Sequence, residues 1–463
     1  MKDTTTRRWP GYNAIWRWHF YAGLFCIPFV LWLACTGSIY LFRPQIEALI
    51  DRPYTRLALN GPRASVAAQA GAAVRAVPGS VLHRYQLPTR PDDAVQVIVG
   101  EGARETRVYV HPQTLAVLKK IDEDDRLMRV IFRLHGELLM GNKGSYLVEL
   151  AASWAIVMIL TGLFLWWPRG GGLGGVLYPR LRSGGRRFWR DIHGVTGFWV
   201  SFFALFLLLS GLPWTKSWGS YLKAVRTVAT GNVVKQDWST GHADELKARA
   251  SIDAGTRAMT NEHAEHGGMT MPHPATSLAP LDRLITTLRP LQLAAPVLIA
   301  PPSAVGQPWT AKSDAANRPL RTDLTLDGAT GAVLTRKDFA EQRLIDRIVG
   351  YGVAAHEGQL FGIANQLIGL FTAIGLMLLS VSSVVLWWRR KPADVLGAPP
   401  ALAMQPIAVG FIAVLVALGL FLPLLGVSML MVLAVEWLLL RRLPGVRRWL
   451  GLRAVQLPIP STS

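Results

Sequence analysis

Residues 134–167 read LHGELLMGNKGSYLVELAASWAIVMILTGLFLWW, and this stretch decides the fold. Its apolar part, residues 145–167, has one charged residue, Glu149, and is long enough to cross about 30 Å of hydrocarbon as a helix. Trp166 and Trp167 end the run, and tryptophan is enriched where a membrane meets water. The stretch therefore predicts a transmembrane helix that begins shortly after His135.

The same pattern occurs again near the end of the chain. His135 precedes a glycine by six residues and a Trp-Trp pair by 31, and His356 has the same spacings. Two other histidines share a glycine four residues later and another eighteen residues later: His19 with Gly23 and Gly37, and His193 with Gly197 and Gly211. Repeated spacing of this kind predicts an internal duplication, in which each unit is helix, soluble domain, helix.

The remaining apolar runs extend this pattern to an α-helical integral membrane protein of about six helices. They are residues 20–42, 145–167, 194–214, 362–388, 406–425 and 427–440. Arginine and lysine fill the connections after the second, fourth and sixth runs, and such residues are retained on the cytoplasmic side. This distribution predicts a multi-pass protein of the bacterial inner membrane, with both termini in the cytoplasm.

Two long polar segments lie on the other side of the membrane in this topology. Both contain alternating runs rich in β-branched residues and followed by turn residues, which is typical of strands. They predict two periplasmic α+β domains. The expected order is cytoplasmic N-terminus and first helix (1–43), first periplasmic domain (44–134), second helix (135–168), basic cytoplasmic loop (169–192), third helix (193–214), second periplasmic domain (215–355), fourth helix (356–388), cytoplasmic loop (389–405), helical hairpin (406–440) and cytoplasmic tail (441–463).

The overall composition excludes several other classes of protein. The 463 residues are 51% hydrophobic, which is too apolar for an ordinary soluble domain. The net charge of +19 lies mostly beside apolar runs, so it indicates membrane topology rather than a nucleic-acid partner. The sequence lacks Cys-x-x-Cys-His, which excludes a covalently attached c-type haem. Residues 170–175 match Gly-x-Gly-x-x-Gly, but they follow a membrane helix rather than a strand, which favours a linker.

The predicted topology sorts the four repeated histidines into two pairs. His19 and His193 begin helices that run outward, whereas His135 and His356 precede helices that run inward. Two imidazoles from separate helices suit a six-coordinate haem iron, so the sequence predicts two b-type haems, one near each membrane face. Gly23 and Gly197 lie one turn from their histidines, where they allow either a haem or a neighbouring helix to approach.

The sequence also resembles a known family. The resemblance rests on Arg17-Trp18-His19, on residues 134–141, on Asp191-Ile192-His193-Gly194 and on the helix end at residues 161–168. These motifs are similar to those of the PepSY-associated transmembrane family, which includes bacterial iron-regulated inner-membrane proteins and ferric-siderophore reductases. The resemblance implies two PepSY-like periplasmic domains, haem ligation by the four histidines and reduction of a ferric siderophore or other metal chelate.

The polar insertion of the second soluble segment contains another group of potential ligands. His263, His266, Met269, Met271 and His273 combine imidazole and thioether, which suit copper(I) or another soft metal. The alternative is a polar tract without a metal. If a metal binds there, copper reduction or handling competes with siderophore reduction. His83, His111 and His242 are expected on the surface.

The sequence therefore favours a haem-dependent oxidoreductase that transfers electrons across a lipid bilayer. No flavin or nicotinamide domain is present, so a quinol or a separate cytoplasmic reductase is expected to supply the electrons. The other class of function is a non-enzymatic membrane module whose periplasmic domains bind or inhibit a partner.

Overall fold

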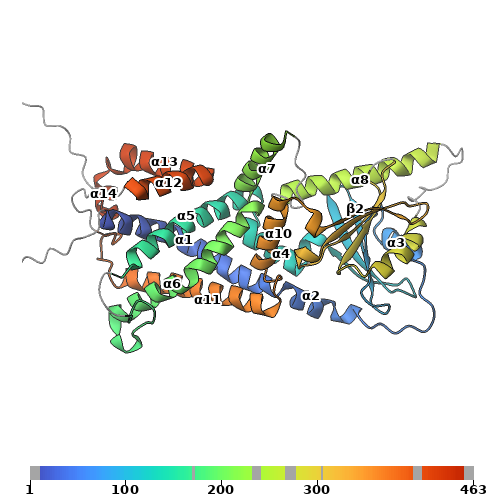
Figure 1. The fold of residues 1–463 in the computed structure, drawn as a ribbon, viewed down its shortest axis with the longest axis horizontal. Helices are drawn as coiled ribbons and strands as arrows, with labels where there is room; N and C mark the ends of the chain where they lie inside the picture. The colour runs from blue at the N-terminus through green and yellow to red at the C-terminus, as the bar shows by residue number, and fades with distance from the viewer. Residues whose placement is uncertain are drawn as a thin grey trace, which may run out of the picture. The chain divides into compact units, whose positions relative to one another are not determined.

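The computed structural model describes residues 11–168, 173–231, 241–265, 278–303, 306–399 and 409–452. The chain divides into two compact units. The first, here called the membrane unit, comprises Met1–Ser38, Lys143–Val234 and Ile368–Ser463. The second, the sheet unit, comprises Ile39–Asn142 and Lys235–Leu367. Figure 1 shows the helices and strands of both units.

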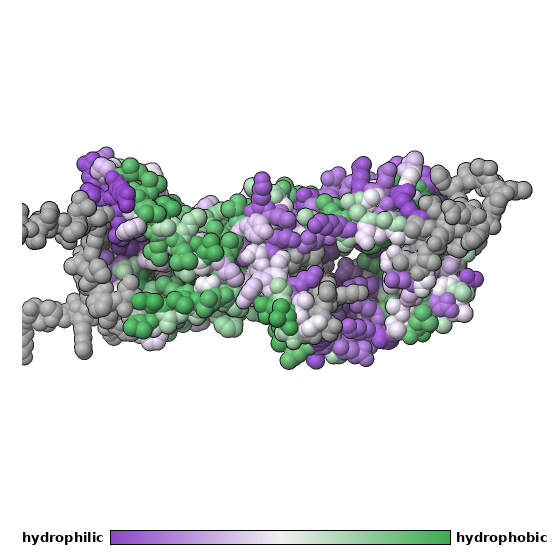
Figure 2. Space-filling model, turned by 90° about the horizontal axis from the view of Figure 1, so that it is seen from above, coloured by the Kyte–Doolittle hydropathy of each residue, from purple (hydrophilic) through white to green (hydrophobic). Residues whose placement is uncertain are grey.

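Five of the described helices are long and apolar enough to cross a membrane. They are α1 (Tyr12–Leu41), α5 (Asn142–Trp166), α6 (Gly185–Gly211), α11 (Ile363–Trp388) and α13 (Pro423–Val435), which continues as a π-helical turn to Leu440. The fifth predicted helix, residues 406–425, begins outside the described residues, and its described part, α12 (Val409–Phe421), has 13 residues. Hydrophobic side chains cover most of the visible face of these helices (Figure 2). The protein is therefore an integral membrane protein. Two shorter helices, α7 (Lys216–Thr230) and α14 (Pro444–Leu450), complete the unit.

Aromatic and small residues bring the long helices together. Trp166 of α5 stacks on Phe198 of α6 with ring centroids 4.3 Å apart. A Cβ on Gly375 of α11 would lie 2.4 Å from Val200 of α6, so glycine allows these backbones to approach closely. Such packing is typical of membrane helices, for which lipid supplies no hydrophobic drive to associate.

The sheet unit contains one antiparallel sheet of eight strands. The first polar segment supplies β1 (Val81–Leu87), β2 (Val95–Glu101), β3 (Arg104–Val110) and β4 (Val117–Asp122). The second supplies β5 (Val297–Ala300), β6 (Trp309–Ser313), β7 (Thr322–Leu326) and β8 (Val333–Asp338). The order is β4-β3-β2-β1-β5-β6-β7-β8, and β1 pairs with β5 through Tyr85 and Ile299. The two predicted α+β segments therefore share one continuous sheet.

The two faces of this sheet pack differently. One face is apolar: α3 (Val66–Ala76) and α9 (Pro280–Leu288) pack on it in a core that includes Tyr85, Leu284 and Ile299. Glu105 and Arg107 alternate with Val108 and point to the opposite face. There α8 (His242–Glu265) packs against β1, β2 and β3: Arg249 forms an ion pair with Glu105, and Asp253 Oδ1 lies 3.6 Å from His83 Nε2.

The remaining helices of the sheet unit flank the strands. α2 (Arg43–Asp51) precedes the sheet, whereas α4 (Leu127–Glu137) follows β4 and α10 (Leu344–His356) follows β8. A short 3-10 turn leads into each of the last two, at Glu123–Asp125 and at Phe339–Glu341. Equivalent strand, turn and helix segments therefore carry His135 near the end of α4 and His356 at the end of α10.

Candidate functional site

The first pair of predicted ligands meets within the membrane unit. His19 lies in the second turn of α1, and His193 lies near the start of α6. Their ring centroids are 6.4 Å apart and the ring planes are nearly perpendicular, at 84°. The structure thus brings together two histidines that are 174 positions apart in the sequence.

One nitrogen of each ring is held by a neighbouring helix. His19 Nδ1 is 3.0 Å from Thr161 Oγ1, and the Thr161 hydroxyl is 2.8 Å from the carbonyl oxygen of Val157 on its own helix. The hydroxyl donates to that carbonyl and accepts a hydrogen bond from His19 Nδ1–H. In this tautomer, Nε2 carries no proton and is the nitrogen able to bind a metal.

The second ring of this pair is held in the same way. His193 Nδ1 is 3.2 Å from Ser382 Oγ and 3.3 Å from the Leu379 carbonyl oxygen. The Ser382 hydroxyl donates to the same carbonyl over 3.0 Å. Nδ1 of His193 is thus also the protonated nitrogen, and Nε2 is left as the potential ligand.

The second pair meets within the sheet unit. His135 lies near the end of α4 and His356 is the last residue of α10. Their ring centroids are also 6.4 Å apart, with an interplanar angle of 78°. Each histidine comes from the helix that follows one half of the sheet.

Both histidines of the sheet unit precede the long helices rather than begin them. After His135 the chain turns through Leu138 and Leu139, which have left-handed φ angles of 52° and 56°, before α5 begins at Asn142. After His356 it turns through Gly358 at φ 73° before α11 begins at Ile363. The predicted segments 135–168 and 356–388 each contain a short helical end, a turn and a membrane helix.

The spacing of both pairs fits a shared metal ion. Metal–imidazole bonds of about 2.0–2.1 Å on opposite sides of one ion place two ring centroids roughly 6.3 Å apart. Edge-to-face contacts between aromatic rings cover the same range, so the distance alone does not decide. The held Nδ1 atoms of the membrane-unit pair favour ligation, because metal-binding histidines donate their other ring N–H in this way.

Glycines near the first pair lie against neighbouring helices. A Cβ on Gly23 would lie 3.6 Å from Met158 Sδ, and one on Gly197 would lie 3.5 Å from Leu379 Cδ2. Both distances are ordinary contacts, so these glycines take part in helix packing, and their predicted contact with haem stays a prediction. Gly162, which sequence reasoning missed, is closer: its Cβ would lie 3.1 Å from His19 Cε1.

Asp191 is another residue whose role the sequence did not reveal. It lies two residues before His193, is almost fully buried and accepts hydrogen bonds from Arg180 Nε at 2.6 Å and Nη2 at 3.0 Å. This bidentate pair fixes the preceding loop against the first turns of α6. The Asp191-Ile192-His193-Gly194 motif thus contains a structural anchor beside the potential ligand.

The expected soft-metal group lies almost wholly outside the described residues. His266, Met269, Met271 and His273 are not described, and His263 belongs to the last turns of α8, whose side chains are not described. Within the described ranges, no group of three or more His, Cys, Asp or Glu residues is arranged to hold a metal ion.

The other histidines are held by the sheet unit. His83 was expected on the surface, and this prediction is wrong: the residue is fully buried, with Nδ1 2.9 Å from Glu105 Oε1. His111 Nδ1 accepts hydrogen bonds from the backbone N–H groups of Gln113 and Thr114. His242 begins α8.

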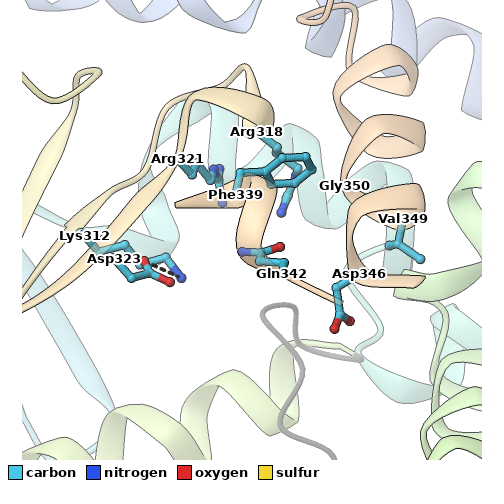
Figure 3. A pocket seen from close by; sticks show the side chains of 9 residues that line it. All are labelled: Lys312, Arg318, Arg321, Asp323, Phe339, Gln342, Asp346, Val349 and Gly350. Carbon is cyan, nitrogen blue, oxygen red and sulfur yellow. Dashed lines mark ion pairs between the residues drawn. The ribbon is translucent and has the colours of Figure 1, made fainter. Parts of the chain in front are cut away.

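A small pocket also opens beside α10 (Figure 3). Cationic side chains, Phe339 and residues of α10 line it: Lys312, Arg318, Arg321, Asp323, Phe339, Gln342, Asp346, Val349 and Gly350. Lys312 pairs with Asp323 at 3.7 Å, and Arg321 pairs with Asp314 at 2.9 Å. Because these charges are already paired, the pocket alone does not identify a ligand.

The described residues contain five helices long and apolar enough to span a membrane, an eight-stranded α+β unit and two pairs of facing histidines. Together they define a class of polytopic membrane protein with a large hydrophilic unit. The sequence model of the PepSY-associated TM region matches residues 16–390, and the chain belongs to this family. The match includes all four paired histidines. No curated protein matches the chain.

Proposed function

We propose that this protein is a transmembrane di-haem b oxidoreductase that reduces a ferric chelate, a ferric siderophore in the first instance. The observation that carries the proposal is the pairing of His19 with His193 and of His135 with His356, each at 6.4 Å between ring centroids. A bis-imidazole haem iron accepts and releases one electron without an open coordination position.

Within this proposal, the chain holds and orients the imidazoles. In the membrane unit, Thr161 and Ser382 hydrogen-bond Nδ1 of each ring, which leaves Nε2 as the nitrogen that would bind the iron. In the sheet unit, the ends of α4 and α10 place the second pair next to the hydrophilic domain, which is the part able to meet a water-soluble chelate. Reduction of Fe(III) weakens its bonds to hard oxygen ligands and thereby favours release of the metal.

We further propose a bacterial inner-membrane topology with cytoplasmic termini and a periplasmic sheet unit. Basic residues support it, because Arg389, Arg390 and Lys391 follow α11, and Arg441 and Arg442 follow α13. Electrons would pass from the His19–His193 pair to the His135–His356 pair, and their source would be a quinol or a cytoplasmic reductase. An internal duplication would account for the equal spacings in the two halves.

The absorption spectrum of the full-length protein in detergent tests haem binding. We expect a Soret band, an α-band that sharpens on reduction with dithionite, and two haems per chain in the pyridine haemochrome assay. His19→Ala and His193→Ala should remove the same haem, whereas His135→Ala and His356→Ala should remove the other. His111→Asn, which changes a histidine in a strand-connecting turn, should retain both.

Two results would overturn the proposal. A colourless parent protein would leave a non-enzymatic binding or inhibitory module as the better assignment. Haems present in the protein but unable to reduce a ferric trihydroxamate chelate would remove the reductase activity. That step is measured anaerobically, from the loss of the reduced α-band after excess dithionite has been removed.

A further inference from the structure

Thr161 and Ser382 occupy equivalent places in the two halves of the chain. Thr161 lies 26 residues after His135, and Ser382 lies 26 residues after His356. Thr161 belongs to α5 and Ser382 to α11, the membrane helices that follow the first and second halves of the sheet. Thr161 contacts His19 of α1, which precedes the first half, and Ser382 contacts His193 of α6, which precedes the second half. The correspondence therefore extends from the histidines to the groups that hold them.

The neighbouring contacts repeat as well. The backbone carbonyl of Met158 accepts a hydrogen bond from the Thr161 hydroxyl, as that of Leu379 accepts one from the Ser382 hydroxyl, and both residues lie three positions before the hydroxyl residue. The Met158 side chain faces Gly23, as the Leu379 side chain faces Gly197. Packing needs alone would not place a hydroxyl on an imidazole nitrogen twice.

The direction of the hydrogen bonds gives these hydroxyls a chemical role. Each hydroxyl proton is directed to a backbone carbonyl of its own helix, so the oxygen presents a lone pair to Nδ1–H. An acceptor on Nδ1–H increases the basicity of the ring and makes Nε2 a better ligand. It also stabilises the more highly charged ferric state relative to the ferrous state.

We propose that Thr161 and Ser382 are positioning residues of the haem site formed by His19 and His193, and that they lower its reduction potential. This inference rests on the proposed function, because it needs a haem at that pair. It adds two residues outside the ligand set and predicts the sign of their effect. Removing either hydroxyl should weaken haem retention by about tenfold or more, the lower end of the usual outer-shell effect being about tenfold.

The test measures the potential of this haem in Thr161→Val and Ser382→Ala. Each variant should shift it upward, and a tenfold loss of preference for ferric over ferrous iron corresponds to a rise of about 59 mV. Thr161→Ser keeps the hydroxyl and should restore the parent potential. The other haem should keep its potential in all variants.

Two buried hydroxyls on α11 provide matched controls. Thr372 bonds the carbonyl of Ile368 and Ser380 bonds that of Leu376, each within its own helix. Thr372→Val and Ser380→Ala should leave both potentials unchanged. In Thr161→Val and Ser382→Ala, part of the protein is expected to lose the haem of the His19–His193 pair. If the molecules that keep this haem show no upward shift in its potential, the inference is refuted and the proposed function stays intact. A colourless parent would overturn both.

Discussion

Replacement of Arg249 by methionine should release α8 from the sheet. Arg249 is 3% exposed, and its guanidinium contacts three carboxylates: Glu105 Oε2 at 3.2 Å, Asp124 Oδ2 at 3.2 Å and Glu245 Oε1 at 2.9 Å. Glu105, on β3, is 1% exposed, so the contact between helix and sheet is a buried ion pair. Methionine keeps much of the apolar stem but removes the charge.

The size of the effect follows from the burial of each partner. Asp124 and Glu245 are 22% and 28% exposed, so water compensates for much of their lost contact. Glu105 is not hydrated, and a buried pair that loses one member costs about 3–5 kcal/mol. Because Arg84 still contacts Glu105 at 2.7 Å, we expect the lower end, about 3 kcal/mol, or about two powers of ten in the opening equilibrium of α8.

Hydrogen exchange of the backbone amides measures that equilibrium. Amides of α8 should exchange about 100-fold faster in Arg249→Met, whereas those of α3, on the apolar face, should change little. Arg336→Met is the matched control, because its ion pair with Asp338 is 50% and 40% exposed and should contribute less than about 1 kcal/mol. An α8 exchange rate within threefold of the parent would falsify the idea that charge holds this helix.

Three other predictions concern separate parts of the protein. Burial alone would raise the pKa of Glu123, but Arg107 and Arg126 lower it from 4.5 to about 2. The ionised Glu123 therefore stabilises the fold fully above pH 4.5, and this contribution is lost as the pH falls through 2. Thermal melts of Glu123→Gln should accordingly show a weaker acid dependence than those of the parent. Glu149 Oε2 accepts hydrogen bonds from the backbone N–H groups of Ser217 and Trp218 at the start of α7, so Glu149→Leu should destabilise that turn by about 1–2 kcal/mol and speed the exchange of its amides; unchanged exchange would contradict this capping role. If each histidine pair holds a haem as proposed, ring planes at 84° and 78° should give strongly anisotropic low-spin EPR spectra in the ferric state. Rhombic spectra typical of parallel imidazoles would contradict this geometry.

The pairing of the histidines could be predicted because it depends on two features that are visible within short stretches of sequence, residue spacing and apolar runs. Each histidine has a fixed spacing to a glycine or to a Trp-Trp pair, and the apolar runs determine on which side it falls. The single sheet could not be predicted in this way. Tyr85 pairs with Ile299 across more than 200 residues, and nothing in either strand encodes that partner.

The position of His83 shows a second limit of sequence reasoning. The register of β1 shifts between Leu82 and Arg84, which turns His83 to the face covered by α8. A Cβ added to Gly100 of β2 would lie 2.0 Å from the His83 ring, so any larger residue at position 100 would collide with it. The burial of His83 therefore needs both the bulge in β1 and a glycine on the next strand. Neither requirement is visible in the residues around His83. The hydroxyls of Thr161 and Ser382, by contrast, had a usable signal in their equal distance from His135 and His356.

Each histidine pair takes one residue from each half of the chain. His19 and His135 come from the N-terminal half, and each faces a histidine of the C-terminal half. One half supplies a single imidazole to each pair, so one half alone would give the proposed haem iron only one of its two protein ligands. β1 and β5 join the halves of the sheet through main-chain hydrogen bonds, and this pairing ties together the strands that lead to α4 and α10. We therefore expect correct pairing of the strands to be a condition for bringing His135 and His356 together. If this pair holds a haem as proposed, a variant that breaks the β1–β5 pairing should lose that haem even with both histidines intact.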